Sequence, residues 1–285
     1  MAGSTTTTLN DLLPEIIQEA MFVASERSIM RGLVKNYSLA PGQGKHVNVP
    51  IYPTQTAAAV TEGDEVANTA VSTNTAQLTV SPVAIRTLLT DLARTSAASN
   101  VVADLGKLFG EAIARKIDTD LTAQFLNFTA FGDGTGAITA ADIFKAVAKL
   151  KAAAVPTEGM VCVLHPEIAY DLKSALTAQG NTPFTAGAYG DNANEAMRMG
   201  SVGMLAGIPV YETSNMANTG NPGDFMGAVF HRDALGLGLI GDISIETQRR
   251  ASFLGDDIVC SAYYGVGVLQ NNYGRGLNFD SSINP

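Results

Sequence analysis

The chain has 285 residues, of which 46% are hydrophobic and 16% charged, a composition that suits one large globular domain or two smaller ones. Its formal net charge is −9 and its longest basic run is the pair Arg249–Arg250, so it lacks the basic patch that tight nucleic-acid binding needs. No apolar run reaches the roughly 18–20 residues of a membrane span, and the N-terminal residues show no secretory signal. We therefore expect a chain that is made in the cytosol and has no membrane partner.

The first third of the chain predicts a helical arm followed by a long hairpin. Residues 10–31 carry apolar side chains at helical spacing. Residues 46–52 and 75–90 alternate between polar and apolar side chains, a pattern typical of strands, and residues 53–74 between them are polar. Together they predict a two-stranded ribbon across residues 45–90, with about 15 residues in each arm. A ribbon of this kind is marginally stable alone in water, so we expect it to lie on a neighbouring copy.

A single long helix is predicted over residues 99–128, because apolar residues recur there every three or four positions. Two pairs of opposite charge at i,i+4 spacing, Glu111–Arg115 and Lys116–Asp120, support the helix. The repeating apolar positions are Val101, Leu105, Phe109, Ile113, Ile117, Leu121, Phe125 and Phe128.

The rest of the chain predicts a mixed α/β segment and then a series of strands. Thr139 and Asp142 form a variant capping box that begins a helix, and the apolar run MVCVL predicts a short buried strand before a second helix at Pro166. Successive strands are then expected in FMGAVFH, LGLGLIG, ISIETQ and DIVCSAYYGVGVL.

The motifs that could carry chemistry are weak. The run GDGTGAITAAD has phenylalanine where a calcium-binding loop needs its first aspartate, so it is interpreted as a turn before a helix. His165 has only Glu167 near it in sequence, and Cys162 and Cys260 lie in apolar runs typical of buried strands. No metal-ligand spacing, cofactor motif or catalytic set is visible, so an enzyme is not expected. Gly236, Gly238, Gly265 and Gly267 indicate close backbone approach or strand bending.

The candidate functional residues are charged side chains at the tip of the ribbon and near the C-terminal strands. Glu62, Asp64 and Glu65 cluster near the ribbon tip. They form either a solvated acidic surface or a contact with basic residues of a neighbouring subunit. Arg249 and Arg250 are the candidate partners for that contact.

The order of these elements resembles that of the major capsid proteins of tailed phages, which have the Hong Kong 97 fold. The resemblance covers most of the chain. It is carried by the ribbon, the long helix and four segments: MVCVLHPEIAYDLKSAL, VGMLAGIPVYETSNM, DFMGAVFHRDALGLGL and IETQRRASFLGDDIVCSAYYGVGVLQ.

The resemblance implies an α+β fold with four parts. They are an N-terminal arm (1–36), an extended β-hairpin loop (37–92), a peripheral domain with the spine helix (93–136 and 241–285) and an axial domain (137–240). Some family members crosslink through a lysine on the loop. Here Lys45 lies at the base of the ribbon and the tip has no lysine, so crosslinking is not expected.

The resemblance also implies a virion protein, assembled in the host cytoplasm, whose copies form hexamers and pentamers of an icosahedral shell. The shell would enclose double-stranded DNA without sequence-specific binding. The implied partners are a portal, a decoration protein and a separate scaffolding protein, the last because the chain begins Met-Ala-Gly without a long helical region. An encapsulin-like compartment holding a cargo enzyme shares the fold and is the main alternative. A soluble enzyme and a tail-tube protein are the others.

Overall fold

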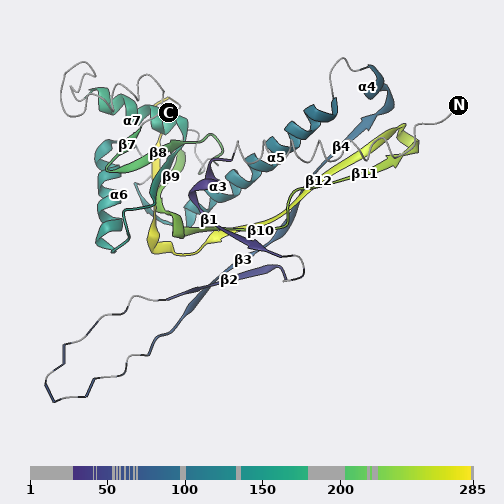
Figure 1. Cartoon of the computed structure of the whole chain (residues 1–285). Helices are drawn as coiled ribbons and strands as arrows, with labels where there is room; N and C mark the ends of the chain where they lie inside the picture. Colours follow the sequence, from purple (N-terminus) through teal and green to yellow (C-terminus); the bar gives the residue numbers. More distant parts are fainter. Residues whose placement is uncertain are drawn as a thin grey trace.

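The computed structural model describes residues 28–283, apart from 97–100, 133–135, 179–202, 217–218 and 220–223 and positions 41, 43, 53, 54, 56, 58, 61, 64, 67 and 69. Most of the helix predicted over 10–31 lies outside the described residues, as does Asp64. The described chain forms a long sheet with a helix along it, a second α/β body at one end of that sheet, and a projecting hairpin (Figure 1).

The long sheet has five strands around a central strand of 14 residues. Register shows that β10 and β11 follow one another along one edge of β12, since Leu235 pairs with Val268 and Arg250 with Gly255. β4 pairs along the other edge, and β1 lies parallel to β10. The strands are β1 (Lys35–Leu39), β4 (Ser81–Thr90), β10 (Leu235–Ile240), β11 (Ser244–Arg250) and β12 (Gly255–Val268).

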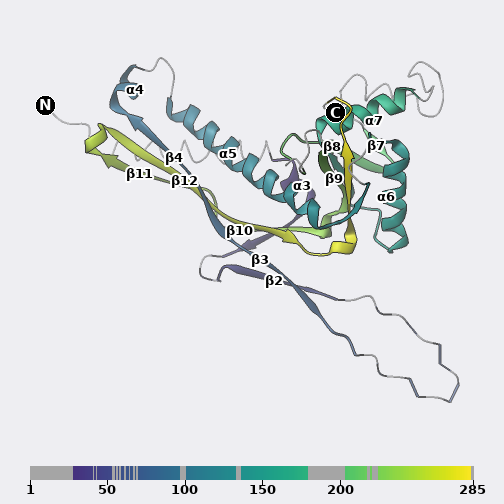
Figure 2. The ribbon, with the colours of Figure 1, turned by 180° about the vertical axis from the view of Figure 1, so that it is seen from behind.

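The predicted long helix is confirmed as α5 (Val101–Ala123), continued by a 3-10 turn at Gln124–Asn127. Its 23 residues span about 34 Å at 1.5 Å per residue. Both views show it lying along the long sheet (Figures 1 and 2). The apolar positions from Leu105 to Phe128 are buried and form one core with the sheet. The helix therefore stiffens the arm because one apolar stripe runs along its length.

The second body is a six-stranded sheet covered by two helices, with its own core. The capping box is confirmed, because one oxygen of Asp142 accepts hydrogen bonds from the backbone and hydroxyl of Thr139 at 3.1 and 2.7 Å. The strands, in sheet order, are β5 (Thr129–Phe131), β13 (Gly274–Asp280), β9 (Asp224–His231), β6 (Met160–Leu164), β8 (Ile208–Glu212) and β7 (Met204–Leu205), and the helices are α6 (Ala140–Ala152) and α7 (Pro166–Ala178).

Short helices complete the described chain. Two are α-helical, α3 (Met30–Leu33) at its start and α4 (Asp91–Ser96) after β4. Three are 3-10 turns, at Arg232–Ala234, Ala251–Phe253 and Asn271–Tyr273.

The predicted ribbon of about 15 residues per arm is wrong in extent. The paired hairpin consists of β2 (His46–Ile51) and β3 (Asn74–Thr79), six residues each. Residues 81–90, predicted as part of its second arm, instead form β4 and pair with β12. Alternation identified a strand with two faces, but it could not say which partner each half would pair with.

The four glycines of β10 and β12 explain how the hairpin crosses the sheet. Gly236 pairs with Gly267 and Gly238 with Gly265, so the four form a square on one face. A Cβ on Gly265 would lie 2.6 Å from the carbonyl carbon of Thr79, and one on Gly267 would lie 2.8 Å from Leu78. The predicted close backbone approach is thus confirmed. Because these four residues have no side chains, β3 can lie directly on the sheet.

Two strands join a different sheet from the one that the predicted domain boundaries indicate. β10 falls in the predicted segment 137–240 but joins the long sheet, whereas β13 falls in 241–285 and joins the six-stranded sheet. Residues 37–39, predicted as part of the loop, belong to β1. The division of the chain into domains stays a prediction.

Candidate functional site

The histidines of the described chain have structural partners. The His165 ring stacks on Phe225 with 3.6 Å between ring centroids. Its Nδ1 accepts the backbone N–H of Glu167 at 3.4 Å, next to the first turn of α7. Burial lowers the pKa of His165, which favours the neutral ring whose Nδ1 can accept this hydrogen bond. His231 contacts the backbone carbonyl of Glu158 through Nε2 at 2.9 Å and accepts a backbone N–H through Nδ1.

The two cysteines are buried and free. Burial raises the pKa of Cys162 to about 12 and that of Cys260 to about 11, so neither is a ready nucleophile. Among the described residues, no group of three or more His, Cys, Asp or Glu could hold a metal ion.

A groove of about 630 Å³ lies between α5 and the segment after β8. Its polar lining includes Glu111, Arg115, Glu212 and Asn215, and Arg115 donates to Asn215 at 3.3 Å. Its lining contains neither histidine nor cysteine. The groove therefore offers charges that position chain segments but no nucleophile beside a histidine base.

Asp118 anchors the start of the described chain to α5. Its side chain is fully buried and accepts the Ser28 hydroxyl at 2.7 Å and the backbone N–H groups of Ile29 and Met30 at 3.2 and 3.3 Å. Burial raises the pKa of Asp118, although these hydrogen bonds and one from Asn215 act in the opposite direction. Asp118 thus fixes residues 28–30 against α5.

The hairpin projects away from both sheets (Figures 1 and 2). Its base is closed by the N–H of Val80, which donates to the Lys45 carbonyl at 2.8 Å. Cross-strand contacts between polar side chains line its outer face, from His46 to Thr79 and from Gln77 to Asn48. Beyond the paired residues, apolar side chains are 47–71% exposed, namely Tyr52, Val60, Val66 and Val71.

The predicted acidic residues lie on this projecting segment. Glu62 and Glu65 are both exposed, and Asp64 lies outside the described residues. The predicted arginine pair belongs to β11, which extends in another direction from the hairpin (Figures 1 and 2). A contact between the two groups would therefore join different copies, and it stays a prediction.

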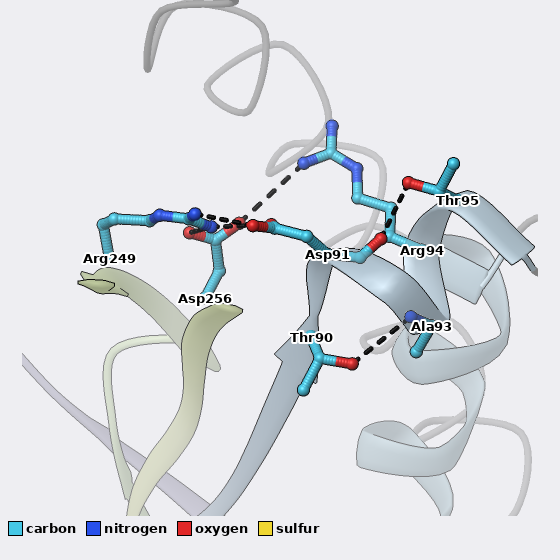
Figure 3. A network of polar contacts seen from close by, with 7 residues as sticks. All are labelled: Thr90, Asp91, Ala93, Arg94, Thr95, Arg249 and Asp256. Carbon is cyan, nitrogen blue, oxygen red and sulfur yellow. Dashed lines mark hydrogen bonds and ion pairs between the residues drawn. The ribbon is translucent and has the colours of Figure 1, made fainter. Parts of the chain in front are cut away.

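Arg249 lies between two carboxylates at the far end of the long sheet (Figure 3). Its two terminal nitrogens donate to the two oxygens of Asp91 at 2.7 Å each, and Nη1 lies 3.5 Å from Asp256. Arg94 lies 3.8 Å from the other oxygen of Asp256. The hydrogen bonds from Arg249 lower the pKa of Asp91, so this carboxylate stays ionised.

Arg250 also has a partner within the chain. Its Nε lies 3.1 Å from Asp257, and Arg86 donates to the same carboxylate at 2.6 Å. Sequence reasoning missed the aspartates, although Asp256 and Asp257 follow the arginine pair across a short turn. That spacing is the signal that could have found them, since antiparallel strands bring such residues together.

No helix in the described part of the chain is long and apolar enough to cross a membrane.

Comparison with known proteins extends the description of the fold. Residues 75–277 match the sequence model of a family described as phage capsid protein. No curated protein matches the chain in sequence.

Solved structures of similar shape cover most of the chain. The structure from Mycobacterium phage Che8 has a TM-score of 0.69 and 23% identity, covering 88% of this chain and 90% of that one. The capsid of cyanophage P-SCSP1u has a TM-score of 0.69 and 18% identity, covering 90% and 89%. A virus-like particle from Pyrococcus furiosus has a TM-score of 0.59 and 9% identity, covering 93% and 98%.

Proposed function

The chain belongs to the phage capsid protein family and has the Hong Kong 97-type α+β fold, and from this premise we propose that its copies form the hexamers and pentamers of an icosahedral head around double-stranded DNA. As a member of that family it is a structural component of a phage shell.

The observation that carries the proposal is the projecting hairpin. Six residue pairs connect β2 and β3, and the apolar side chains described beyond Ile51 and Asn74 are exposed. The base of the hairpin lies on the sheet, with Leu78 buried, but the segment beyond the paired strands has little burial to stabilise it. A neighbouring subunit lying under the hairpin would supply that burial, and the same contact repeated around a ring would link every copy to the next.

The net charge of the chain is more consistent with a shell that encloses DNA than with a protein that binds DNA tightly. A formal net charge of −9 gives no electrostatic attraction to phosphates. A closed shell needs none, because its wall confines the molecule instead of binding it. Many weak contacts between copies then act together, so that the assembled shell is far more stable than any single contact.

The remaining parts of the proposal concern partners and place. A separate scaffolding protein would guide closure, a portal would occupy one vertex, and a decoration protein would bind the finished surface. Assembly would take place in the host cytoplasm, and crosslinking through a lysine of the hairpin tip is not part of the proposal.

The test shortens the hairpin without disturbing its base. Replacing residues 52–73 by Asn-Gly would leave Ile51 opposite Asn74, a pair in the same hydrogen-bonded series as Lys45 and Val80, and close a two-residue turn on the existing register. We expect a folded subunit with an unchanged unfolding transition that no longer forms closed shells by negative-stain microscopy and sedimentation. Full-size stable shells from this variant would contradict the proposed role of the hairpin.

A protein compartment of the encapsulin type is the second candidate, favoured by the similarity to the virus-like particle from Pyrococcus furiosus. The contents of purified particles distinguish the two. Nuclease-protected DNA supports the phage head, and a co-purifying enzyme without DNA supports the compartment.

A further inference from the structure

His231 lies where the chain passes from the second body into the long sheet. It is the last residue of β9, and β10 begins at Leu235 after a short 3-10 turn (Figure 1). β9 belongs to the six-stranded sheet and β10 to the long sheet, so we call residues 231–235 the crossing. His231 is only 9% exposed, which means that protein surrounds its ring on nearly every side. A side chain in this place can influence how the two bodies lie relative to each other.

The two ring nitrogens of His231 contact both sides of the crossing. Nε2 lies 2.9 Å from the carbonyl oxygen of Glu158, in the turn before β6 of the second body. Nδ1 accepts the backbone N–H of Asp233 at 3.2 Å, within the 3-10 turn that leads into β10. A carbonyl needs a donor and an N–H needs an acceptor, so these contacts require a neutral ring with its hydrogen on Nε2.

Asp233 also connects the crossing to β1. Its Oδ1 lies 3.1 Å from Nζ of Lys35, the first residue of β1, and its Oδ2 lies 3.6 Å from Nδ1 of His231. Lys35 in turn pairs with Gly236 of β10. One carboxylate therefore lies within reach of a lysine on the long sheet and of the histidine at the crossing.

We propose that His231 is a proton-operated latch between the two bodies. A second proton on the ring would occupy Nδ1 and face the N–H of Asp233, so that this backbone hydrogen bond is lost. The Asp233 carboxylate then becomes the acceptor, and a charge-assisted hydrogen bond would shorten its 3.6 Å separation from Nδ1 to about 2.9 Å. This exchange turns Asp233, moves the chain that enters β10 and draws the carboxylate away from Lys35.

The other polar groups around the ring do not duplicate this role. Tyr273 packs against it with 5.8 Å between ring centroids, and Arg275 lies on the neighbouring strand β13, paired with Val229. Arg232 follows in the turn, and the side chain of Glu158 is exposed. Histidine alone among these residue types ordinarily changes its charge between about pH 5 and about pH 8. The latch is therefore closed at the upper end of this range and opens on acidification.

The test measures the distance between the two bodies in unassembled subunits, so it does not depend on shell formation. Ala93→Cys on α4 and Ala148→Cys on α6 introduce two exposed thiols, one at each end of the molecule, while the two natural cysteines are buried. Spin labels on this pair should give a distance distribution by double electron–electron resonance that shifts between about pH 8 and about pH 5. The same pair with His231→Gln should give one distribution at both pH values, because glutamine keeps a donor for the Glu158 carbonyl but does not titrate.

A second measurement reports on the latch itself. Nitrogen-15 NMR of the His231 ring should show the neutral tautomer with hydrogen on Nε2 at about pH 8. As the ring takes up its proton, amide exchange of Asp233, corrected for its intrinsic pH dependence, should accelerate by about tenfold because one hydrogen bond is lost. His46→Gln is the matched control, because His46 lies on the hairpin and should change neither result. An unshifted distance distribution in the labelled parent, or a shift that persists with His231→Gln, would overturn the proposal.

Discussion

Adding a methyl group to Gly265 should displace the base of the hairpin from its position on the sheet and destabilise the subunit. The change Gly265→Ala suits the backbone, because Gly265 lies in strand β12 and is not among the residues with positive φ. The difficulty is purely steric. The new Cβ would lie 2.6 Å from the carbonyl carbon of Thr79 and 3.0 Å from the nitrogen of Val80, and nearer still to the Thr79 oxygen.

The new Cβ would clash with backbone atoms of Thr79 and Val80, so no side-chain rotation relieves the clash. Moving the Thr79 carbon from 2.6 to 3.0 Å already shifts β3 by 0.4 Å, and clearing the oxygen requires more. The shift strains the hydrogen bond from Val80 to Lys45 that closes the hairpin. Overpacking of this kind costs about 1–3 kcal/mol. At about 2–4 °C per kcal/mol for a large domain, Tm should fall by several degrees.

Gly238→Ala is the matched control, because Gly238 pairs with Gly265 in the same square. The one tight contact of its Cβ would be with a Val47 methyl group at 3.2 Å, which can move, whereas the Gly265 oxygen and the Val80 side chain would lie at an ordinary 3.8 Å. We expect less than about 1 kcal/mol in either direction, since alanine also restricts the unfolded chain.

The measurement is calorimetry and urea unfolding of both variants as unassembled subunits, followed by sedimentation of assembly mixtures. Gly265→Ala should lower both stability and shell yield, and Gly238→Ala should change neither appreciably. Two variants with the same stability as the parent would refute the idea that the glycine square sets the position of the hairpin.

Further predictions concern single charged or buried residues. The pKa of Asp118 is raised above its ordinary value of 3.8, so the folded state binds this proton more tightly than the unfolded state does. The protonated side chain therefore contributes most to the free energy of unfolding below the unfolded-state pKa. That contribution is lost as pH rises through the folded-state pKa. Asp118→Asn should therefore reduce the loss of stability as pH rises between these two pKa values. Identical pH profiles of urea unfolding for the variant and the parent would contradict this. Asp142→Ala removes the reciprocal cap of α6 and should cost about 1 kcal/mol in the same assay; no change would mean that water replaces the cap. Changing Glu62 and Glu65 together to glutamine should leave unfolding unaltered and reduce assembly at low salt, provided that the acidic tip meets arginines of another copy; an increase in assembly would instead indicate that the tip carboxylates repel each other.

Local patterns were sufficient for much of the fold. The four-residue repeat from Leu105 to Phe125 places a continuous stripe on one face of a helix, so α5 and its buried side could be predicted without knowing what covers it. The capping box of α6 is likewise a contact between residues three apart in the chain. The spacing of the strand glycines indicated close approach, because only a surface without side chains admits another backbone.

The tertiary structure decided everything that depends on which segments meet. The alternating run 75–90 specifies two faces, yet only the fold divides it at Val80 between β2 and β12. Arg249 and Arg250 were identifiable as a basic pair, but their partners depend on the register of β11 with β12 and on the position of α4. The left-handed backbone of Leu254 depends on the turn that connects β11 and β12, two strands whose pairing is decided by the fold. Periodicity is a local property of the chain, whereas pairing and burial depend on contacts between residues distant in sequence.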